Sequence, residues 1–462
     1  MPAPGRDRSA WFSSVIRSRW EWVCQQDSGS IRLCKQKMGL QQFFQELPRI
    51  LQGNRRRPGA ANHLGNFNNA IIPGQGLDFT DGLGARVILV HQEMLVTPTP
   101  LTERMTLFWH NHFVSSQQKV KSAHLMYRQH VLLRRKALGN FSELLHAVSK
   151  DPAMIVYLDN ATNRRSQPNE NFAREVMELF TLGMGHYTEQ DIKEAARAFT
   201  GWSLDRASGE FRFYRMVHDD GQKTVLGRSG YFDGDAVLDI LLAQPQTAEF
   251  ISAKLWREFV SPDPDVKQVK RLALLFREAR YEIKPVLRAL FSSDEFYAPM
   301  HRARLIKSPV DLLVGTLRQF GVEGLDTRLL VFSGRQLNQD LFGPPNVKGW
   351  PGGADWINST TLLARKQFME RIFRAEEMSM DQRTLRDELG PGAARMLAGQ
   401  ALSENLRFDT TIFFDAFKGN EAQRRVGVSR LVLASPASHQ PVASERIEFI
   451  RHLVLDPMYQ LK

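Results

Sequence analysis

Residues 167–202 read QPNENFAREVMELFTLGMGHYTEQDIKEAARAFTGW, and this stretch predicts two consecutive amphipathic helices. The first begins near Pro168-Asn169 and ends at Gly183. Its apolar residues fall at i, i+4, i+7 and i+8, which places them on one buried side of a helix: Phe172, Val176, Leu179 and Phe180. The opposite side carries Glu170, Arg174 and Glu178 at intervals of four residues, a spacing typical of surface ion pairs.

The second helix begins at Thr188, and Asp191 three residues later gives the pattern of a capping box. Its buried side is predicted to consist of apolar residues, and Gly201 ends it. These apolar residues are Ile192, Ala195, Ala196 and Phe199. A third helix is expected to begin at Thr99-Pro100 and to run towards Trp109, because proline suits the first helical position.

Outside these helices, residues 247–260 and 266–278 also have amphipathic helical patterns. Residues 210–235 differ, because aromatic and β-branched residues surround a turn, which predicts a short hairpin. The fold is therefore predicted to be mainly α: a multi-helical globular fold with a small β hairpin or short strands near residues 210–230.

The chain has 462 residues, of which 42% are hydrophobic and 24% are charged. These values permit a large core and exclude a wholly disordered, collagen-like or coiled-coil chain. No run of about 18 apolar residues occurs, so no membrane-spanning helix is expected. The net charge is +11, but the basic residues are scattered, and we interpret them as a solvated surface. No signature of a nucleic-acid-binding fold occurs, so nucleic acid is not an expected partner.

Sequence patterns predict three parts of the chain. Residues 1–60 form an atypical N-terminal segment, and residues 61–84 form a linker rich in Gly, Asn and Arg. Residues 85–462 form the main domain, with helical lobes at 85–235 and 236–375 and a C-terminal helical part at 376–462. Charged residues interrupt every apolar run near the N-terminus, so no secretory signal is visible and the localisation is left open.

Residues 108–113 read FWHNHF, which places His110 and His112 two positions apart. Two such histidines can share a metal ion on an extended backbone, whereas on a continuing helix they lie about 200° apart. A metal site therefore requires either that the helix ends near Trp109 or that only one of the two histidines is a ligand. In the alternative interpretation, each histidine caps the helix or forms a hydrogen bond in the core.

Two further polar motifs contain candidate catalytic residues. Glu170 and Glu178 are candidates for a general base or metal ligand, and Asn169, Asn171 and Arg174 are candidates for substrate binding. In the segment HDDGQK, His218 and Asp219 are candidate catalytic residues, and Lys223 is a candidate for holding an anion. The structural alternatives are a surface ladder of ion pairs for the first motif and a polar hairpin turn for the second.

Residues 342–356 read FGPPNVKGWPGGADW and predict an ordered loop, because proline restricts the backbone. Asn346, Lys348 and Trp350 are candidate substrate-binding residues, and Trp350 with Trp356 could form a wall for a sugar or aromatic ligand. The alternative, which we favour slightly, is that these indoles cover the core.

Five strings in this order resemble one bacterial family, the domain of unknown function 1800: ERMTLFWHNHF (103–113), the stretch 167–202, HDDGQKTVLG (218–227), FGPPNVKGWPGG (342–353) and LVLDPMYQLK (453–462). The similarity covers about residues 85–462 and carries no settled activity. The resemblance implies that members are often exported. It also implies a candidate partner, since members are commonly encoded beside a sulfatase-like protein of unknown function with a twin-arginine signal.

Three functional hypotheses follow. In the first, the chain is an enzyme that uses metal-assisted or acid/base chemistry on a polar polymer or conjugate, and a divalent metal ion is the candidate cofactor. In the second, it is a non-catalytic helical scaffold or partner-binding protein, and the motifs are buried polar networks that fix helix ends. A third hypothesis is polyanion binding through the basic excess.

Overall fold

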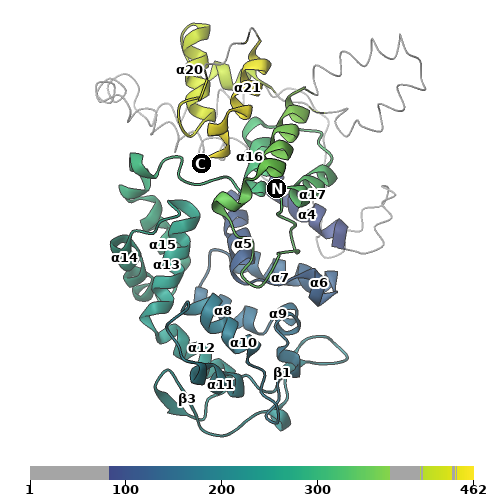
Figure 1. Cartoon of the computed structure of the whole chain (residues 1–462), viewed down its shortest axis with the longest axis vertical. Coiled ribbons are helices and arrows are strands. Elements are labelled where there is room, and N and C mark those ends of the chain that lie inside the picture. The colour runs from purple at the N-terminus through teal and green to yellow at the C-terminus, as the bar shows by residue number, and fades with distance from the viewer. Residues whose placement is uncertain (1–82, 375–405, 407–408, 440–442, 444) are drawn as a thin grey trace, which may run out of the picture. The chain divides into compact units, whose positions relative to one another are not determined.

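A computed structural model describes residues 83–374, 406, 409–439, 443 and 445–462 (Figure 1). The chain divides into two units, Met1–Ala85 and Arg86–Lys462, and nearly all of the described residues belong to the second. The predicted N-terminal segment 1–60 and most of the linker 61–84 lie outside the described residues. The described fold is mainly α-helical, as predicted, with short antiparallel strands.

The first helices of the described chain surround a core of large aromatic residues. They are α4 (Leu83–Val96), α5 (Pro100–His112), α6 (Gln117–Val120), α7 (Ala123–Lys136), α8 (Phe141–Ser149) and α9 (Pro152–Tyr157). As predicted, Thr99 precedes α5 and Pro100 occupies its first turn, but the helix continues past Trp109 to His112. The indole of Trp109 is fully buried, and its Nε1 donates a hydrogen bond to Ala137 O at 3.0 Å.

The helix predicted at 168–183 consists of two parts. α10 (Glu170–Glu175) begins at the cap Asn169, and a π-helix, η2 (Val176–Thr181), continues it. A π-turn bonds residue i to i+5 and is wider than an α-turn, so it changes which side chains face inward. Met177 is buried and Leu179 is only half-buried, which corrects the predicted position of Leu179 on the buried side.

The second predicted helix is α11 (Glu189–Ala198), and its capping box is present as expected. Thr188 Oγ1 accepts a hydrogen bond from Asp191 N at 3.1 Å, and Asp191 Oδ2 accepts one from Thr188 N at 2.8 Å. The predicted apolar side is fully buried, and Gly201 follows the helix with φ of +82°.

Two short antiparallel pairs follow α11, which confirms the predicted strands near residues 210–230. β1 (Trp202–Leu204) pairs with β2 (Phe211–Phe213), so that Trp202 lies opposite Phe213. β3 (Lys223–Val225) pairs with β4 (Arg228–Gly230) across a two-residue turn. Between the pairs lies the 3₁₀ turn η3 (Arg215–Val217), and β3 packs against α11.

The rest of the described chain is again helical. It contains α12 (Gly234–Ala243), α13 (Pro245–Phe259), α14 (Val266–Glu278), α15 (Ile283–Phe291), α16 (Pro309–Phe320) and α17 (Thr327–Gln336). A further helix occupies residues 359–374, and α19 (Thr411–Asp415), α20 (Glu421–Val432) and α21 (Arg446–Leu455) follow. The helices predicted at 247–260 and 266–278 correspond to α13 and α14, which pack against each other.

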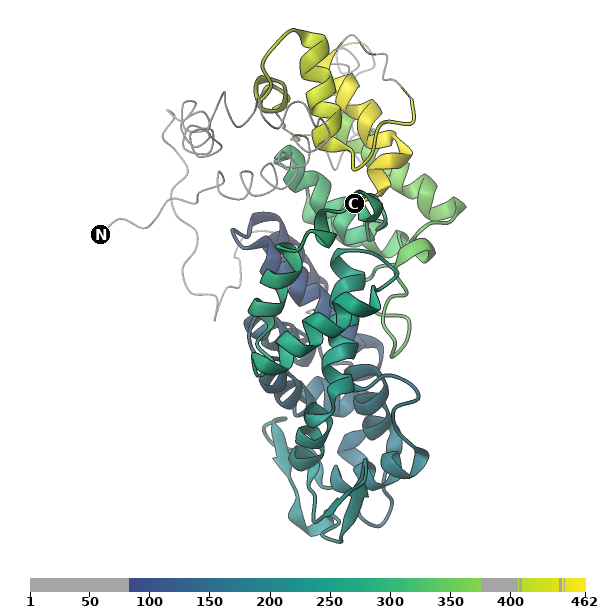
Figure 2. The same cartoon turned by 90° about the vertical axis from the view of Figure 1, so that its left-hand side faces the viewer.

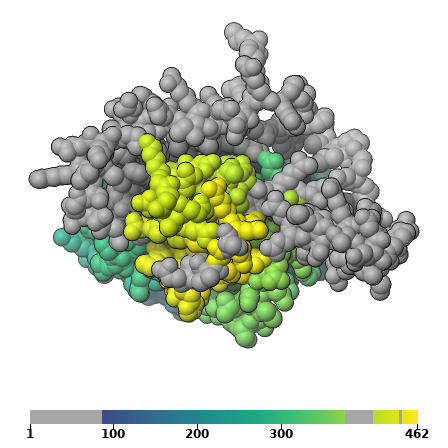
Figure 3. Space-filling view, turned by 90° about the horizontal axis from the view of Figure 1, so that it is seen from above, coloured from purple at the N-terminus to yellow at the C-terminus, as the bar shows by residue number. Residues whose placement is uncertain are grey.

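Helices α20 and α21 belong to the C-terminal part that was predicted to be helical. They pack against each other, and their residues appear as adjacent light green and yellow surfaces in the space-filling view (Figure 3). Part of the predicted region 376–462, namely 376–405 and a few later positions, lies outside the described residues. Among the helices that the structure describes, none is both long enough and apolar enough to span a lipid bilayer.

Candidate functional site

The FWHNHF motif and the loop 342–356 are joined through one asparagine. Asn111 Oδ1 accepts a hydrogen bond from Trp350 N at 2.7 Å, and Asn111 Nδ2 donates one to Trp350 O at 3.3 Å. The backbone of the loop comes so close that a Cβ atom at Gly349 would overlap the Asn111 side chain. Gly349 also has φ of +84°, a conformation that favours glycine. Two of the predicted motifs therefore meet at this junction.

His112 connects the same motif to the π-helix. Its Nε2 donates a hydrogen bond to Phe180 O at 3.1 Å, and its Nδ1 accepts one from Lys254 Nζ at 2.9 Å. Lys254 Nζ also donates to Leu179 O at 3.3 Å. Carbonyl groups in the last turn of a helix lack partners within the helix. His112 and Lys254 therefore act together as a side-chain cap for the C-terminal end of η2.

Burial controls the charge of this cap. The pKa of Lys254 is lowered to about 7, first by burial and then by the positive charge of Arg257. The pKa of His112 is lowered well below its usual value, first by burial and then by Lys254. His112 is therefore neutral at neutral pH, with its proton on Nε2, because Phe180 O can only accept a hydrogen bond.

His110 has a different set of neighbours. Its Nε2 lies 2.9 Å from His130 Nδ1, and the two rings stack with centroids 5.2 Å apart. Burial lowers the pKa of both histidines, that of His110 to about 4. The pair lines a cavity of about 10 Å³, roughly the space of one water molecule, together with Val90, Met94, Leu107, Leu341, Phe342 and Trp350.

The metal prediction for His110 and His112 depended on a helix ending near Trp109. Because α5 continues through His112, the two rings contact different partners rather than converging. Across the described ranges, no three or more His, Cys, Asp or Glu side chains are grouped so as to hold a metal ion. A metal ion bound through one of these histidines stays a prediction.

The asparagines at the start of α10 bind the main chain. Asn169 Oδ1 accepts from Asn171 N at 3.0 Å, and Asn171 Nδ2 donates to Leu158 O at 3.2 Å. The backbone N of Asn169 in turn donates to Asn163 Oδ1 at 2.9 Å. These contacts fix the loop 158–169 against the first turn of the helix.

The predicted ladder of Glu170, Arg174 and Glu178 is present only in its first half. Arg174 pairs with Glu170 at 3.3 Å, and it binds both carboxylate oxygens of Glu189, at 2.8 and 2.7 Å. Glu178 instead accepts a hydrogen bond from Tyr187 OH at 2.7 Å. The π-turn lies between Arg174 and the end of the helix, so Glu178 is not one α-helical turn beyond Arg174.

Glu175 is a candidate that the sequence did not reveal. Burial raises its pKa, and the negative charge of Glu178 raises it further, whereas Arg174 and Lys348 act in the opposite direction. Lys348 from the loop 342–356 therefore lies near the carboxylates of α10. Nothing in the spacing of Glu175 indicated this, because its environment depends on a loop more than 160 positions away in the sequence.

The HDDGQK segment forms a turn that is bound to Arg197 and Thr200 at the end of α11. His218 Nδ1 donates to Thr200 O at 2.8 Å, and Asp219 forms a two-pronged ion pair with Arg197 at 2.7 and 3.0 Å. The buried Lys223 ammonium donates to Asp219 O and to Gly221 O. Hydrogen bonds from Arg197 lower the pKa of Asp219, and burial lowers the pKa of Lys223.

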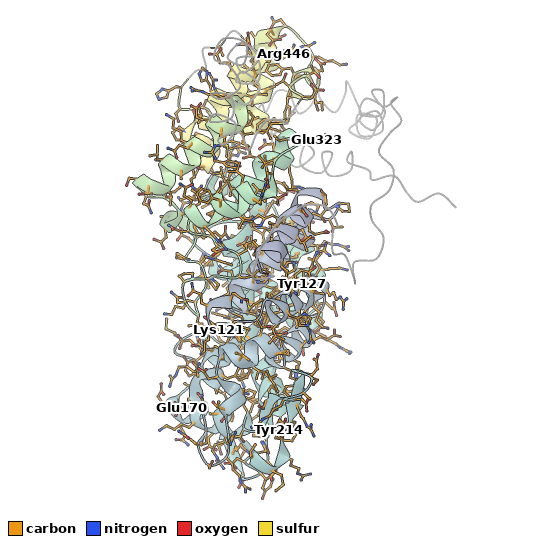
Figure 4. All side chains as sticks on the ribbon, turned by 90° about the vertical axis from the view of Figure 1, so that its right-hand side faces the viewer. Lys121, Tyr127, Glu170, Tyr214, Glu323 and Arg446 are labelled. Carbon is orange, nitrogen blue, oxygen red and sulfur yellow. The ribbon has the colours of Figure 1, made fainter. Side chains whose placement is uncertain are left out.

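The charged cluster around Arg174 and the charged cluster of the HDDGQK turn contact opposite ends of α11. Arg174 contacts Glu189 in the first turn, and Asp219 contacts Arg197 in the last. Eight residues separate Glu189 from Arg197, a rise of about 12 Å along a helix. Glu170 and Tyr214, which precedes the HDDGQK turn, both lie towards the lower end of the view in Figure 4. The structure therefore pairs Arg174 with Glu170 and places Glu178 and Lys348 where their charges act on Glu175, whereas His218, Asp219 and Lys223 form a second cluster.

The loop 342–356 presents its polar and aromatic groups on different sides. Trp350 and Trp356 are buried, as expected if the indoles cover the core. Asn346 and Lys348 are exposed, and Asn346 Oδ1 accepts a hydrogen bond from Lys348 N at 2.9 Å. The structure does not place an exposed indole beside the two candidate binding residues.

Fold and site together define a mainly α-helical protein in which polar motifs join helix ends to distant loops. The family model described as "Protein of unknown function (DUF1800)" matches residues 77–439, and the chain belongs to this family. Comparisons with curated proteins and with solved structures found no match.

Proposed function

We propose that this chain is a non-catalytic helical protein that binds a protein partner, and that its polar motifs hold the fold in shape. The observation that carries this proposal is the use of motif side chains as ligands for the main chain of other segments. Asn111 binds Trp350, His112 binds Phe180 and His218 binds Thr200. Buried polar groups need such partners, and groups engaged in this way are not free for substrate.

The size of the space at the motif junction also supports this proposal. The cavity beside His110 and His130 measures about 10 Å³, which suits a water molecule rather than a sugar or a peptide. The candidate partner is the sulfatase-like protein that the family resemblance associates with this chain. A large partner of this kind needs an outer surface of the fold and no internal pocket.

The experiment measures binding and stability on the same variants. Purified full-length chain is titrated with the product of the neighbouring gene, and binding in the micromolar range or tighter is expected. His112→Ala is expected to lower the free energy of unfolding by about 1–3 kcal/mol, because Phe180 O loses its donor. Glu170→Ala serves as the surface control, since an exposed ion pair contributes less than about 1 kcal/mol.

Two outcomes would contradict the proposal. One is the absence of binding to the neighbouring protein at concentrations of tens of micromolar. The other is a His112→Ala variant that keeps full stability, since the motif would then not support the fold.

A second candidate function, acid/base catalysis on a polar polymer, is favoured by one observation. Glu175 has a raised pKa and lies near Glu178 and the exposed Lys348. A carboxyl group with a perturbed pKa beside other charged groups is a feature of many catalytic sites. A panel of neutral and sulfated oligosaccharides tests this function, with Glu175→Gln and Glu178→Gln as variants. Turnover that disappears in both variants would support it, and turnover that neither changes would exclude these residues.

A further inference from the structure

Helix α14 presents a strongly cationic side to solvent. Lys267, Lys270, Arg271 and Arg277 are all exposed, and at about 100° per residue they fall within an arc of about 120°. The buried side of the helix is apolar and faces α13 and α15, and it consists of Val269, Leu272, Ala273 and Phe276. The cations therefore form one outward stripe along the helix.

The charge of this stripe is not balanced within the described part of the chain. Lys267, Lys270 and Arg277 form no ion pair there, and Arg271 donates its only side-chain hydrogen bond to Gln268 Oε1 at 2.8 Å. By contrast, Arg128 and Arg174 each bind both oxygens of a carboxylate. Like charges three or four residues apart repel each other on a helix, and an anionic ligand would relieve this repulsion.

The acidic groups around the helix are mostly occupied. Asp265 caps the first turn and accepts from Gln268 N at 2.8 Å, and Asp263 pairs with Arg304 at 2.9 Å. Glu278 is the one carboxylate on the exposed arc of α14. The arc thus has an excess of three positive charges, counting four cations against Glu278.

Further exposed cations follow the helix, with the exposed carboxylate of Glu282 among them. Arg280, Lys284 and Arg288 are exposed in the following turn and in α15, and within the described ranges they too have no ion pair. In Figure 1, α14 lies at the left edge, outside α13 and α15, and Figure 2 turns this edge towards the viewer. The stripe is therefore accessible to a large flat partner.

Two exposed aliphatic side chains indicate which anionic partner fits. Leu274 is 64% exposed and lies in the middle of the cationic arc, and Val266 is 69% exposed in the first turn. The exposed side has no aromatic, amide or hydroxyl side chain for stacking on bases or sugars. Exposed Lys and Arg side chains are attracted to the phosphates of an anionic membrane surface, and aliphatic side chains between them can enter the headgroup boundary.

We propose that α14 binds an anionic lipid surface, with its Lys and Arg side chains at the headgroup phosphates and Leu274 at the start of the acyl region. Lys and Arg have aliphatic stems that can follow the boundary while their charges stay in water. This binding site is independent of the polar motifs and of the partner proposed above. It would hold the chain at a membrane without a spanning helix.

The test is vesicle co-sedimentation of the full chain. Vesicles of phosphatidylcholine alone are compared with vesicles that also contain phosphatidylglycerol, and binding is expected only to the latter. Lys267→Glu/Lys270→Glu is expected to lower the partition coefficient at least about tenfold, because each cation near an anionic surface contributes roughly a fivefold factor and the double variant removes two cations. The matched control is Arg206→Glu/Arg228→Glu, which replaces two exposed arginines outside α14 and changes the net charge by the same amount. This control is expected to change the partition coefficient less than about twofold.

Leu274→Ser separates a lipid surface from a soluble polyanion. It is expected to weaken binding to the anionic vesicles about threefold or more, and to leave binding to heparin and to single-stranded DNA unchanged. Equal loss in the double variant and in its control would overturn the proposal, because net charge alone would then explain binding. Unchanged vesicle binding in Leu274→Ser, or binding to DNA tighter than to vesicles, would assign the stripe to a soluble polyanion instead.

Discussion

Asn111 and Trp350 are 239 positions apart in the sequence, yet the side-chain amide of the first forms two hydrogen bonds with the backbone of the second. An amide that accepts from a residue's backbone N and donates to the same residue's carbonyl fixes the two peptide units on either side of that residue. The pair attaches the loop 342–356 to the end of α5. A second link is the hydrogen bond from Gln117 N, at the start of α6, to Phe342 O at 2.9 Å.

Gly349 makes this approach possible, so its substitution is the first test. Gly349→Ala would place a Cβ atom against the Asn111 side chain, 2.9 Å from Asn111 O. Gly352 has a similar φ of +79°, but its nearest neighbour would be 4.0 Å from an added Cβ. We expect Gly352→Ala to cost about 1–3 kcal/mol from backbone strain alone, and Gly349→Ala to cost about 1–3 kcal/mol more from the broken contacts. Urea unfolding measures both, and equal costs would show that the Asn111 contact does not support the loop.

The lowered pKa of Lys254 predicts that the folded chain becomes more stable as the pH rises above 7. Its pKa in the folded chain is lowered to about 7, whereas an unfolded lysine titrates near 10.4. Between these values the unfolded chain binds the extra proton, so the free energy of unfolding rises with pH by at most about 1.4 kcal/mol per unit. Lys254→Met removes this contribution and is expected to flatten the rise between pH 7 and 10. The exposed Lys193→Met is the control, and a slope that is the same in wild type and Lys254→Met would contradict the prediction.

The buried histidines predict a loss of stability in acid. Burial lowers the pKa of His130 well below its usual value and that of His110 to about 4. Below pH 6.5 the unfolded chain takes up protons that the folded chain cannot, so stability present above pH 6.5 is lost as the pH falls towards 4. His130→Gln is expected to reduce the difference between the free energies of unfolding measured with denaturant at pH 5 and at pH 7. His124→Gln, an exposed change on the same helix, should leave that difference as it is in wild type, and identical behaviour of the two variants would refute the assignment.

Asp191 is expected to contribute more to the stability of the fold than a residue that only caps a helix. Its Oδ2 accepts from Thr188 N at 2.8 Å within the capping box, while its Oδ1 accepts from Leu226 N at 2.7 Å in the turn between β3 and β4. Thr188→Ala removes one half of the box and is expected to cost about 1 kcal/mol. Asp191→Ala removes the other half and also leaves Leu226 N without its acceptor, so its cost is expected to be about 1 kcal/mol larger. Thermal unfolding of the two single variants measures both losses of stability. Equal losses in Thr188→Ala and Asp191→Ala would show that the contact with Leu226 N does not stabilise the fold.

Much of the architecture could be predicted because it depends on local patterns. The capping box at Thr188, the proline that begins α5 and the apolar periodicity of α13 and α14 all act within one or two helical turns. Such signals predicted a mainly α fold with short strands, and the structure has it. The position of Leu179 and the second half of the ladder were wrong because both assumed a regular α-helix through residue 180. A π-turn there changes the direction of each later side chain.

The candidate site shows where sequence patterns stop being informative. They singled out His110, His112, Glu178 and Lys348 as polar residues in distinctive strings, but they gave no partners for them. Spacing within a string cannot indicate a neighbour from a distant segment, and Lys254, His130, Tyr187 and Glu175 became relevant only through such contacts.

By itself, the sequence determined the helical class, the ends of several helices and the family, because these depend on residues close together in the chain or on strings that occur in order. Only the tertiary structure decided which polar groups are buried together. That choice sets their charge, because removal from water penalises the ionised form of a side chain and no local pattern records how deeply a side chain is buried. The lowered pKa values of Lys254 and His112 are consequences of packing between α5, α13 and η2.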